Sequence, residues 1–364
     1  MMKTITWVTA GYMLQVDLPI LAGLKKYFDI SWVVLAPKKS DVFDTATEYA
    51  QEHCIGIQFY DVQKKWYDPR GYFEFKRIFK DISTRDSDIF YLNMVAFPYA
   101  LLAIEKTLPS EKIVMAMHHG KIHKGMRLPT LYKYYLKHLC SLPYRFQYFS
   151  ETQAAYFYGK DLLRRDVIPL ALNDFGQSDL KPSETMVQFL SFGHIIKTKN
   201  IQLLIEAACK LKEKTEKPFK VKIAGNCRSW ETLYKPLIKY PEIFDLDIRM
   251  VPNSFIPEYF TTSHYLVLPY KSVTQSGPLR IAYGYNVPVI VSDLDGFKES
   301  VVENITGVFF KSEDVDSLVS VMERVLNGGM EYYRRLRESQ SSYIKAHLSV
   351  ESVVSQYCEM FYKV

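Results

Sequence analysis

The feature that most constrains this sequence is a repeated alternation of short apolar runs with helix-like segments. Residues 1–172 contain seven apolar runs of strand length: ITWVTAG, ISWVVLAP, IGIQFYDV, DIFYLNM, KIVMAMHH, FQYFS and DVIPLAL. Segments with helical periodicity, such as DLPILAGLKKYF and FPYALLAIEKTL, separate them. Strands that alternate with helices indicate βαβ units and a parallel sheet. The pattern therefore predicts a doubly wound α/β domain.

The alternation starts again after a polar stretch at 173–186, NDFGQSDLKPSETM, which we interpret as a linker. Six further runs follow: VQFLSFG, FKVKIAG, FDLDIRMV, HYLVLPY, VPVIVSD and GVFF. Helices are predicted between them over 200–214, around 229–239, near 257–263 and over 276–286. A chain of 364 residues suits two domains, which we place at 1–172 and 185–345, followed by an amphipathic terminal helix over 346–364.

Composition narrows the class of protein. No stretch of 18 or more apolar residues occurs, and the N-terminal MMKTITWVTAGYML lacks a signal-peptide pattern. The five cysteines are far apart and form no CxxC pair, which argues against a zinc site or a disulfide framework. We therefore expect a protein of the reducing cytoplasm.

A basic, aromatic segment stands out in the first domain. Residues 1–170 hold 23 Lys and Arg against 17 Asp and Glu, so this half carries the whole net charge of +6. No acidic residue occurs from Lys112 to Ser150, and tyrosines alternate with the basic residues over 121–145. Such a surface suits anionic lipid headgroups at the inner membrane face. A solvated helix face with buried tyrosines is the more favoured alternative. Nucleic-acid binding is less favoured, because no recognised motif accompanies the charge.

The segment VTQSGPLRIAYGYNVPVIVSD, residues 273–293, places a Ser-Gly step between a buried strand and a helix. We expect Ser276 to cap this helix, with Gly277 and Pro278 in its first turn. The first N–H groups of a helix lack partners within it and carry partial positive charge, so a phosphate gains hydrogen bonds there. An ordinary capped helix is the alternative.

A second candidate anion site lies at FGHIIKTKNIQLLIEA, residues 192–207. A strand ends there at Gly193, and the loop before the next helix carries the basic residues His194, Lys197 and Lys199. Lysine side chains are flexible point-charge partners for phosphate. Together with the turn at 276–277, this loop predicts a phosphate pocket at one edge of the second sheet.

Three segments, FGHIIKTKNIQLLIEA, IPEYFTTSHYLVLPYKSVTQSG and AYGYNVPVIVSDLDGFKESVVENITGVFF, resemble the retaining glycosyltransferases of family 4, which have the GT-B fold. The resemblance continues through SEDVDSLVSVMERVL to HLSVESVVSQYCEMFYKV and covers nearly all of 185–364. The first half is more weakly similar, at VMAMHHGKIHKG and YFSETQAAYFYGK. The resemblance implies two Rossmann-like domains facing a central cleft, with the terminal helix returning to the first domain. It also implies an acceptor site in the first domain and a nucleotide-diphosphate sugar, of UDP or GDP type, in the second.

The resemblance further implies which residues hold the donor. The lysine of the family's GRLxxxKG element matches Lys199, and His194 occupies its arginine position next to Gly193. Glu299 matches the acid of the GGxxE element, either as a ligand contact or as a loop anchor.

One donor element departs from the family pattern. The EGFGxxxLEA segment aligns over 273–281, where Val273 and Ile281 replace both glutamates. A TQSG version of this segment occurs in some branches of the family. We therefore expect the donor to be held instead by Thr274, Gln275, Ser276 and Gly277.

On the acceptor side, His118 matches the histidine at the family's reaction centre and is the predicted catalytic residue. His119 and His123 follow in the same HHGKIH stretch and are expected to bind the acceptor. A neutral imidazole can donate to or accept from a sugar hydroxyl. Gly11, after the first strand, matches the small-residue loop under the acceptor and the donor phosphate.

No cofactor and no catalytic metal are predicted. The DxD triplets at 86–88, 245–247, 293–295 and 314–316 are scattered as in chance occurrence. The sequence therefore predicts a metal-independent, retaining glycosyltransferase for a saccharide or lipid-linked saccharide in surface-polysaccharide synthesis. Two alternatives stay open: a GT-B enzyme without transfer, such as a nucleotide-sugar 2-epimerase or a phosphorylase, and a non-catalytic nucleotide-sugar-binding module.

Overall fold

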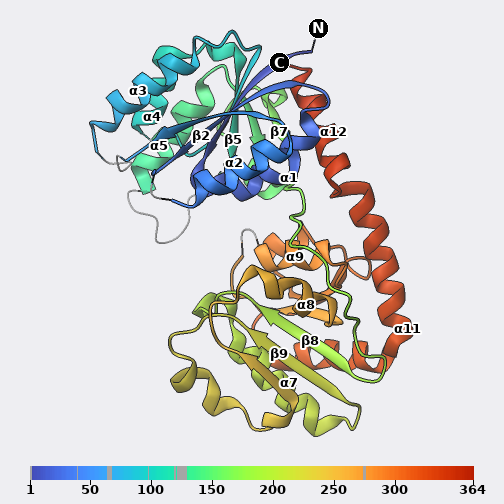
Figure 1. Ribbon diagram of the computed structural model, residues 1–364. Coiled ribbons are helices and arrows are strands. Elements are labelled where there is room, and N and C mark those ends of the chain that lie inside the picture. Colours follow the sequence, from blue (N-terminus) through green and yellow to red (C-terminus); the bar gives the residue numbers. More distant parts are fainter. Residues whose placement is uncertain are drawn as a thin grey trace. The chain divides into compact units, whose positions relative to one another are not determined.

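The computed structural model describes residues 2–38, 40–63, 68–96, 98–118, 120, 129–273 and 276–364. The chain forms two compact units, Met1–Ala171 together with Leu348–Val364, and Leu172–His347. Each unit contains a parallel sheet with helices on both faces (Figure 1). Both units therefore have the doubly wound α/β architecture predicted from the sequence.

Within its described residues, the first unit has a seven-stranded sheet in the order β3-β2-β1-β4-β5-β6-β7. The strands are β1 (Thr4–Ala10), β2 (Asp29–Ala36), β3 (Gly56–Asp61), β4 (Ile89–Asn93), β5 (Ile113–Met117), β6 (Arg145–Tyr148) and β7 (Arg165–Val167). The helices are α1 (Leu14–Leu24), α2 (Val42–Glu52), α3 (Gly71–Ile82), α4 (Tyr99–Thr107), α5 (Pro129–Ser141), α6 (Glu151–Ala154) and α12 (Val350–Phe361). Short 3-10 turns occur at η1 (Gly11–Met13), η2 (Ser110–Lys112) and η3 (Leu162–Arg164). The strand predictions for this half are confirmed.

Alternate residues of β1 enter different hydrophobic cores, one on each face of the first sheet. Ile5 and Trp7 pack on the side of α1, α2 and α12, whereas Val8 and Ala10 pack on the side of α3, α4 and α5. Successive side chains of a strand point to opposite faces, so a strand that is covered on both sides is apolar throughout. This burial explains why the runs in the sequence are continuous.

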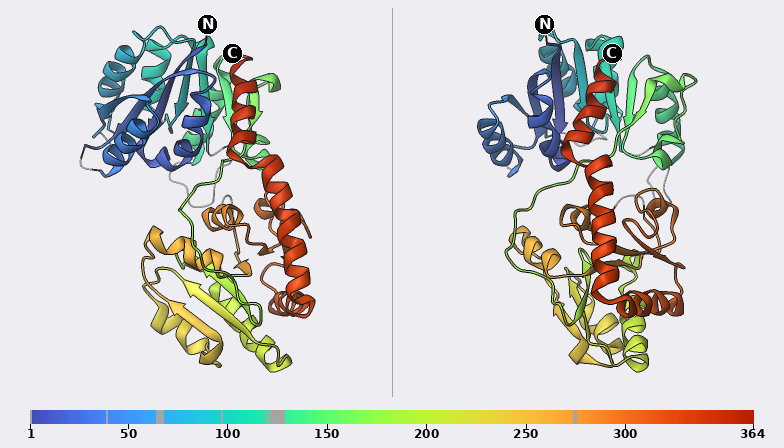
Figure 2. Two further views of the ribbon diagram at one scale, coloured as in Figure 1. Left: turned by 45° about the vertical axis from the view of Figure 1, so that its right-hand side comes forward. Right: turned by 90° about the vertical axis from the view of Figure 1, so that its right-hand side faces the viewer.

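The C-terminal helix α12 is part of the first unit and lies beside α1 (Figure 2). A Cβ added at Gly23 of α1 would lie 2.7 Å from Val354, so the absence of a side chain permits this close approach. The ring of Phe361 meets those of Trp7 and Phe28 edge to face, with centroids 6.1 and 5.5 Å apart. Buried aromatic pairs of this geometry stabilise a core beyond their buried area. The last residues of the chain therefore complete the core formed by the first ones.

The second unit contains, in the part the structure describes, six parallel strands in the order β10-β9-β8-β11-β12-β13. The strands are β8 (Val187–Phe192), β9 (Phe219–Ala224), β10 (Phe244–Asp247), β11 (Tyr265–Leu268), β12 (Val289–Ser292) and β13 (Gly307–Phe310). The α-helices are α7 (Ile201–Lys214), α8 (Ile256–Thr261), α9 (Gly277–Gly284), α10 (Asp295–Lys298) and α11 (Val315–His347), the last kinked at Gly329. Shorter turns are η4 (Lys197–Lys199), η5 (Trp230–Tyr234), η6 (Lys235–Leu237), η7 (Pro241–Ile243) and η8 (Asn253–Phe255). The strand predictions for this half are confirmed as well.

One helix prediction is wrong. The segment around 229–239 is not an α-helix but a π-helical turn, η5, followed by the 3-10 turn η6. Pro236 has no N–H to donate to a helical hydrogen bond, which disfavours an unbroken α-helix through this segment.

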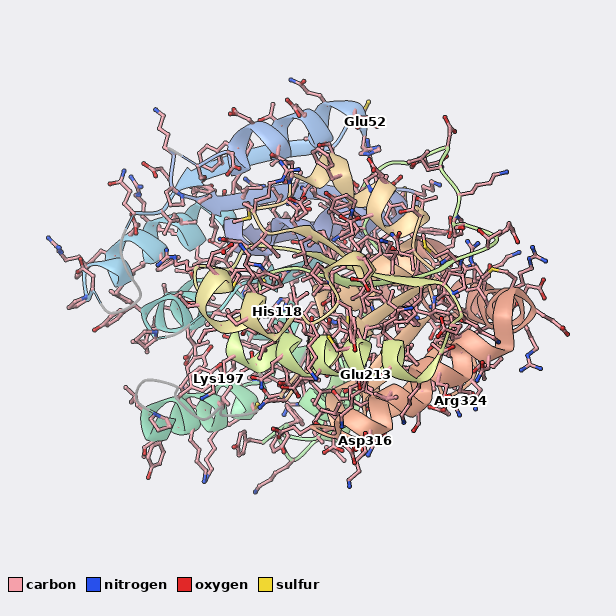
Figure 3. All side chains as sticks on the ribbon, turned by 90° about the horizontal axis from the view of Figure 1, so that it is seen from below. Glu52, His118, Lys197, Glu213, Asp316 and Arg324 are labelled. Carbon is pink, nitrogen blue, oxygen red and sulfur yellow. The ribbon has the colours of Figure 1, made fainter. Side chains whose placement is uncertain are left out.

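Helices α7 and α11 pack against each other on one face of the second sheet; Figure 3 labels Glu213 on α7, and Asp316 and Arg324 on α11. Their apolar sides share a core that includes Leu204 and Met322. Across the described helices, none is long and apolar enough to cross a membrane. The five cysteines are free thiols.

Candidate functional site

Each sheet has a switch point at which the strand order reverses. In the first sheet it lies between β1 and β4, where Thr9 is opposite Asn93. In the second sheet it lies between β8 and β11, where Leu190 is opposite Leu266. Ligands of open α/β sheets bind beyond the carboxyl ends of the strands at such points. Each unit therefore has its own candidate centre.

In the second unit, helix α9 begins after the loop that follows β11. Ser276 is the N-cap, and its side-chain oxygen accepts a hydrogen bond from the Leu279 N–H at 3.4 Å. Pro278 has no N–H, so Gly277 is the residue of this turn whose N–H can meet a ligand. A phosphate at this helix start gains one backbone hydrogen bond from the turn and needs side-chain cations to neutralise most of its charge.

Lys199 is the candidate for such a cation. Its Nζ lies 3.7 Å from the ring centroid of Tyr270, which follows β11. The Lys271 N–H donates to the carbonyl of Thr198 at 2.9 Å and so ties the loop after β11 to the turn η4. Burial lowers the pKa of Lys199. Because a partly desolvated ammonium has lost hydration, an adjacent anion stabilises it more than it would stabilise an exposed one.

Tyr270 connects this lysine to the helix start. Burial raises the pKa of Tyr270 to about 12, and a hydrogen bond with Ser276 acts in the opposite direction. The Tyr270 carbonyl accepts a hydrogen bond from the Ser292 hydroxyl at 2.9 Å, at the end of the neighbouring strand β12. The neutral phenol thus lies between the ammonium and the N-cap of α9.

The backbone after β8 and helix α10, which follows β12, both lie close to the segment that leads from β11 into α9. Gly193 has a φ of 109°, and a Cβ added there would lie 3.3 Å from Pro278. A Cβ added at Gly296 of α10 would overlap the backbone carbonyl of Val273. The structure therefore brings together the predicted residues Gly193, Lys199, Ser276 and Gly277 at one edge of the second sheet.

Of the remaining predicted donor residues, the structure describes His194 and Glu299. His194 is exposed in the loop after Gly193, and Glu299 is half-buried directly after α10. Ile281 is half-buried on α9. Thr274 and Gln275 lie outside the described residues. The donor contacts expected of His194 and Glu299 stay predictions.

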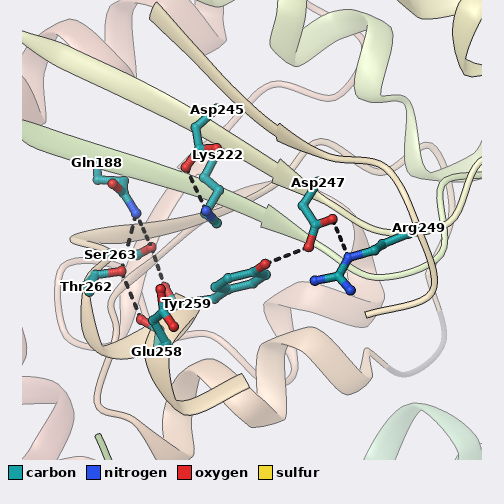
Figure 4. A network of polar contacts seen from close by, with 9 residues as sticks. All are labelled: Gln188, Lys222, Asp245, Asp247, Arg249, Glu258, Tyr259, Thr262 and Ser263. Atoms are coloured by element: carbon teal, nitrogen blue, oxygen red, sulfur yellow. Dashed lines mark hydrogen bonds and ion pairs between the residues drawn. The ribbon is translucent and has the colours of Figure 1, made fainter. Parts of the chain in front are cut away.

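Both aspartates of the DxD triplet at 245–247 form hydrogen bonds or ion pairs with side chains of the second unit (Figure 4). Lys222 Nζ pairs with Asp245 at 2.6 Å. Asp247 accepts hydrogen bonds from Arg249 Nε at 2.7 Å and from the Tyr259 hydroxyl at 2.5 Å. Both carboxylates are therefore engaged by neighbouring side chains. The described residues contain no group of three or more His, Cys, Asp or Glu side chains arranged to hold a metal ion.

In the first unit, His118 directly follows β5 and is half-buried. Its ring stacks on that of Phe149, with centroids 4.3 Å apart. Its Nε2 lies 2.6 Å from Oδ1 of Asn93, the last residue of the neighbouring strand β4. Asn93 is fully buried, so this hydrogen bond fixes the orientation of the imidazole.

Asn93 connects His118 to a buried carboxyl group on α1. Asn93 Nδ2 donates to Asp17 Oδ1 at 2.7 Å, and the Thr9 hydroxyl donates to Asp17 Oδ2 at 2.6 Å. Trp32 Nε1 donates to the Thr9 hydroxyl at 2.8 Å. Burial raises the pKa of Asp17 to about 7, while hydrogen bonds, including those from Thr9 and Asn93, act in the opposite direction.

Gly11 begins η1 at the end of β1. A Cβ added at Gly11 would lie 2.8 Å from the Cβ of Ala36, so a larger residue would displace this loop from the end of β2. His119 and His123 lie outside the described residues, as does the rest of 121–128.

Among the residues of these centres, Asp17, Asn93 and Tyr270 were absent from the sequence-based predictions. Asn93 carries a readable signal, because it is a polar side chain at the carboxyl end of the apolar run DIFYLN. Asp17 is the one acidic residue of the apolar segment LQVDLPILAGL. Tyr270 has no comparable signal, because a tyrosine after an apolar run is indistinguishable from a core residue.

The basic segment of the first unit is partly described. Helix α5 buries Leu136, Leu139 and Cys140 and turns Leu131 and Tyr134 outward, with 51% and 67% of their surfaces exposed. Lys133 and Lys137 are exposed on the same helix. Of the tyrosines in this segment, Tyr144 is buried and Tyr134 is exposed. The membrane-surface interpretation stays a prediction.

Comparison with known proteins relates the chain to glycosyltransferases. Residues 176–343 match the family described as Glycosyl transferases group 1. Among solved structures, the chain is similar to a glycosyltransferase from Rickettsia africae, with 14% identity, a TM-score of 0.78 and coverage of 100% of this chain and 98% of that chain. It is also similar to HepE from Anabaena in complex with UDP, with 12% identity, a TM-score of 0.76 and 100% of each chain covered. The lipopolysaccharide outer core galactosyltransferase WaaB shares 14% identity, with a TM-score of 0.71 and coverage of 100% of this chain and 99% of that chain. No curated protein sequence is significantly similar. At these identities the structural likeness establishes the fold, which is the GT-B fold expected from the sequence.

Proposed function

We propose that this chain, whose residues 176–343 match the Glycosyl transferases group 1 family, transfers a sugar from a nucleotide-diphosphate sugar to a saccharide acceptor. The observation that carries the proposal is the juxtaposition of the Lys199 ammonium, the Tyr270 ring and the capped start of α9 at the switch point of the second sheet. The UDP bound to the similarly folded HepE favours a UDP-type donor.

The chemistry of the site follows from the charge of the leaving group. Negative charge grows on the diphosphate as its bond to the sugar breaks, and preorganised cations and N–H groups stabilise this charge in the transition state. Lys199 is already partly desolvated, and the exposed His194 and the Gly277 N–H complete the donor set. We propose that these groups act without a catalytic metal.

We propose more specifically that the chain is a retaining glycosyltransferase of family 4. The departing phosphate lies on the face of the sugar that the acceptor attacks in such a reaction, and it can take the acceptor proton itself. His118, held against Phe149, would orient the sugar at the acceptor side as the catalytic residue.

The acceptor is proposed to be a saccharide or lipid-linked saccharide used in surface-polysaccharide synthesis. The support is the outward face of α5, where Leu131 and Tyr134 lie beside Lys133 and Lys137. Apolar side chains flanked by lysines bind the interface of an anionic membrane. The protein would then work in the cytoplasm at the inner membrane face.

Nucleotide binding tests the proposal before any acceptor is known. Isothermal titration with UDP, GDP and ADP identifies the nucleotide, and Lys199→Ala is expected to weaken binding of the preferred diphosphate about tenfold to a hundredfold. This range corresponds to the loss of a charge-assisted hydrogen bond of about 1.5–3 kcal/mol.

Lys214→Ala is the control, since Lys214 is an exposed lysine at the far end of α7, the helix that follows the Lys199 turn. Its effect should be small. Equal binding by Lys199→Ala and wild type would remove Lys199 from the site. Tight nucleotide binding without sugar transfer to any saccharide would instead favour a binding module, and release of free nucleotide with an altered sugar would favour an epimerase.

A further inference from the structure

We propose that Asp17 and Asn93 are positioning residues that hold the His118 imidazole as its Nε2–H tautomer, so that Nδ1 is the basic nitrogen. The proposal rests on the proposed function only in the role given to His118 at the sugar. The hydrogen-bonded chain itself belongs to the first unit and joins β1, α1, β4 and β5.

The first step concerns the carboxyl group. Asp17 is fully buried and its two oxygens face two donors, the Thr9 hydroxyl at 2.6 Å and the Asn93 amide nitrogen at 2.7 Å. Above its pKa of about 7 this carboxyl group is ionised, and an ionised carboxylate can only accept hydrogen bonds. It therefore attracts the NH₂ end of the Asn93 amide and repels the oxygen end, which fixes the orientation of that amide.

The second step concerns the amide. With its nitrogen turned to Asp17, Asn93 presents Oδ1 to His118 Nε2 at a distance of 2.6 Å. An amide oxygen can only accept, so Nε2 must carry the hydrogen. In a neutral imidazole the lone pair then belongs to Nδ1.

The surroundings hold this arrangement in place. Asn93 and Thr9 are fully buried, and the Trp32 indole donates to the Thr9 hydroxyl, which directs its hydrogen toward Asp17. The His118 ring is also fixed by stacking on Phe149. The nearby titratable groups that interact with Asp17 are phenols, Tyr49, Tyr91 and Tyr357, and burial raises the pKa of each. The ionised Asp17 carboxylate therefore determines which group donates and which accepts in the hydrogen bonds from Asp17 through Asn93 to His118.

The substitution Asp17→Asn gives a specific prediction. The introduced carboxamide can still accept from Thr9, but its NH₂ group then needs an acceptor where the carboxylate had accepted. Asn93 can supply this acceptor by turning its amide through 180°, which places its NH₂ group toward His118 Nε2. Nε2 must then accept, and the hydrogen moves to Nδ1.

Histidine-selective ¹⁵N NMR at pH 8.5 reads the tautomer directly, because protonated and unprotonated ring nitrogens have well-separated resonances. The His118 signals are assigned from their loss in His118→Gln. In the wild type we expect a protonated Nε2 and an unprotonated Nδ1, and in Asp17→Asn we expect the two assignments to exchange. Thr9→Val is the control: it removes one donor but keeps the carboxylate, so the tautomer should match that of the wild type.

A wild-type His118 with its hydrogen on Nδ1, or an Asp17→Asn variant that keeps the wild-type tautomer, would overturn the proposal. The wild-type spectrum alone decides the first point, even if a variant fails to fold. The measurement needs no substrate. Its result is therefore independent of nucleotide binding, which is tested through Lys199 in the second unit.

Discussion

His264 shows how a single buried side chain makes the fold sensitive to pH. It is fully buried at the start of β11; its Nδ1 accepts from the Gln188 N–H, and its Nε2 donates to the Ser183 carbonyl, both at 2.9 Å. A second proton on the ring would face the Gln188 N–H. Burial lowers the pKa of His264, so folding favours the neutral form.

We therefore expect acid to destabilise the second unit. Because the pKa of His264 is lower in the folded than in the unfolded chain, its contribution to the free energy of unfolding is complete above the unfolded value of about 6.5 and is lost as the pH falls below it. Urea unfolding at pH 7.5 and 5.5 should show a smaller decrease for His264→Asn than for the wild type. His347→Asn, a change at an exposed histidine of the same unit, should retain the wild-type decrease.

Single residues also show where inference from sequence reaches its limit. Lys199 and Ser276 could be predicted because each follows a recognisable strand and carries a charge or a capping group. Asp17 and Asn93 could not be assigned to His118, since 76 residues separate the two side chains that meet at 2.7 Å. A contact of that range depends on the strand order, which the periodicity of the sequence does not specify.

At the scale of the elements, the close approach of the backbone after β8 to the first turn of α9 depends on a glycine. Gly193 has a φ of 109°, which a residue with a side chain rarely adopts, and an added Cβ would approach Pro278. Gly193→Ala is expected to lower the free energy of unfolding by about 1–3 kcal/mol and to weaken nucleotide binding, because α9 must shift. Urea unfolding and titration with the preferred nucleotide measure the two effects.

Gly277→Ala is the comparison that tests whether backbone strain causes the loss of stability expected of Gly193→Ala. Gly277 is the first residue of α9, and an added Cβ meets nothing within 4 Å. The free energy of unfolding should be unchanged or slightly higher, since alanine is a better helix former than glycine. A loss of stability equal to that of Gly193→Ala would contradict the assignment of strain to Gly193.

The strands were predictable because a parallel sheet that is covered on both faces requires continuous apolar runs. Helices were less so. The segment 229–239 has helix-like apolar spacing, yet it forms a π-helical turn followed by a 3-10 turn that contains Pro236. The apolar spacing alone does not indicate this change of helical type.

At the scale of the whole molecule, the α5 face predicts where the protein binds. Liposomes that contain phosphatidylglycerol should retain the wild type more strongly than phosphatidylcholine liposomes. The double variant Lys133→Glu/Lys137→Glu should bind about tenfold more weakly or worse, since each lysine near an anionic surface contributes about 1 kcal/mol. Arg335→Glu/Lys345→Glu, an equal charge change at two exposed residues of α11, should have little effect. Equal retention by the two kinds of liposome would exclude this surface as a membrane contact.

The place of α12 in the first unit has a consequence for folding. Phe361 covers Trp7 and Phe28, although the whole second unit lies between these residues in the sequence. Contacts between such distant segments form slowly, because the long intervening loop must close before they are gained. The second unit, which is continuous in sequence, can therefore fold without waiting for this closure, whereas the first unit exposes an aromatic patch until residues 348–364 dock on it.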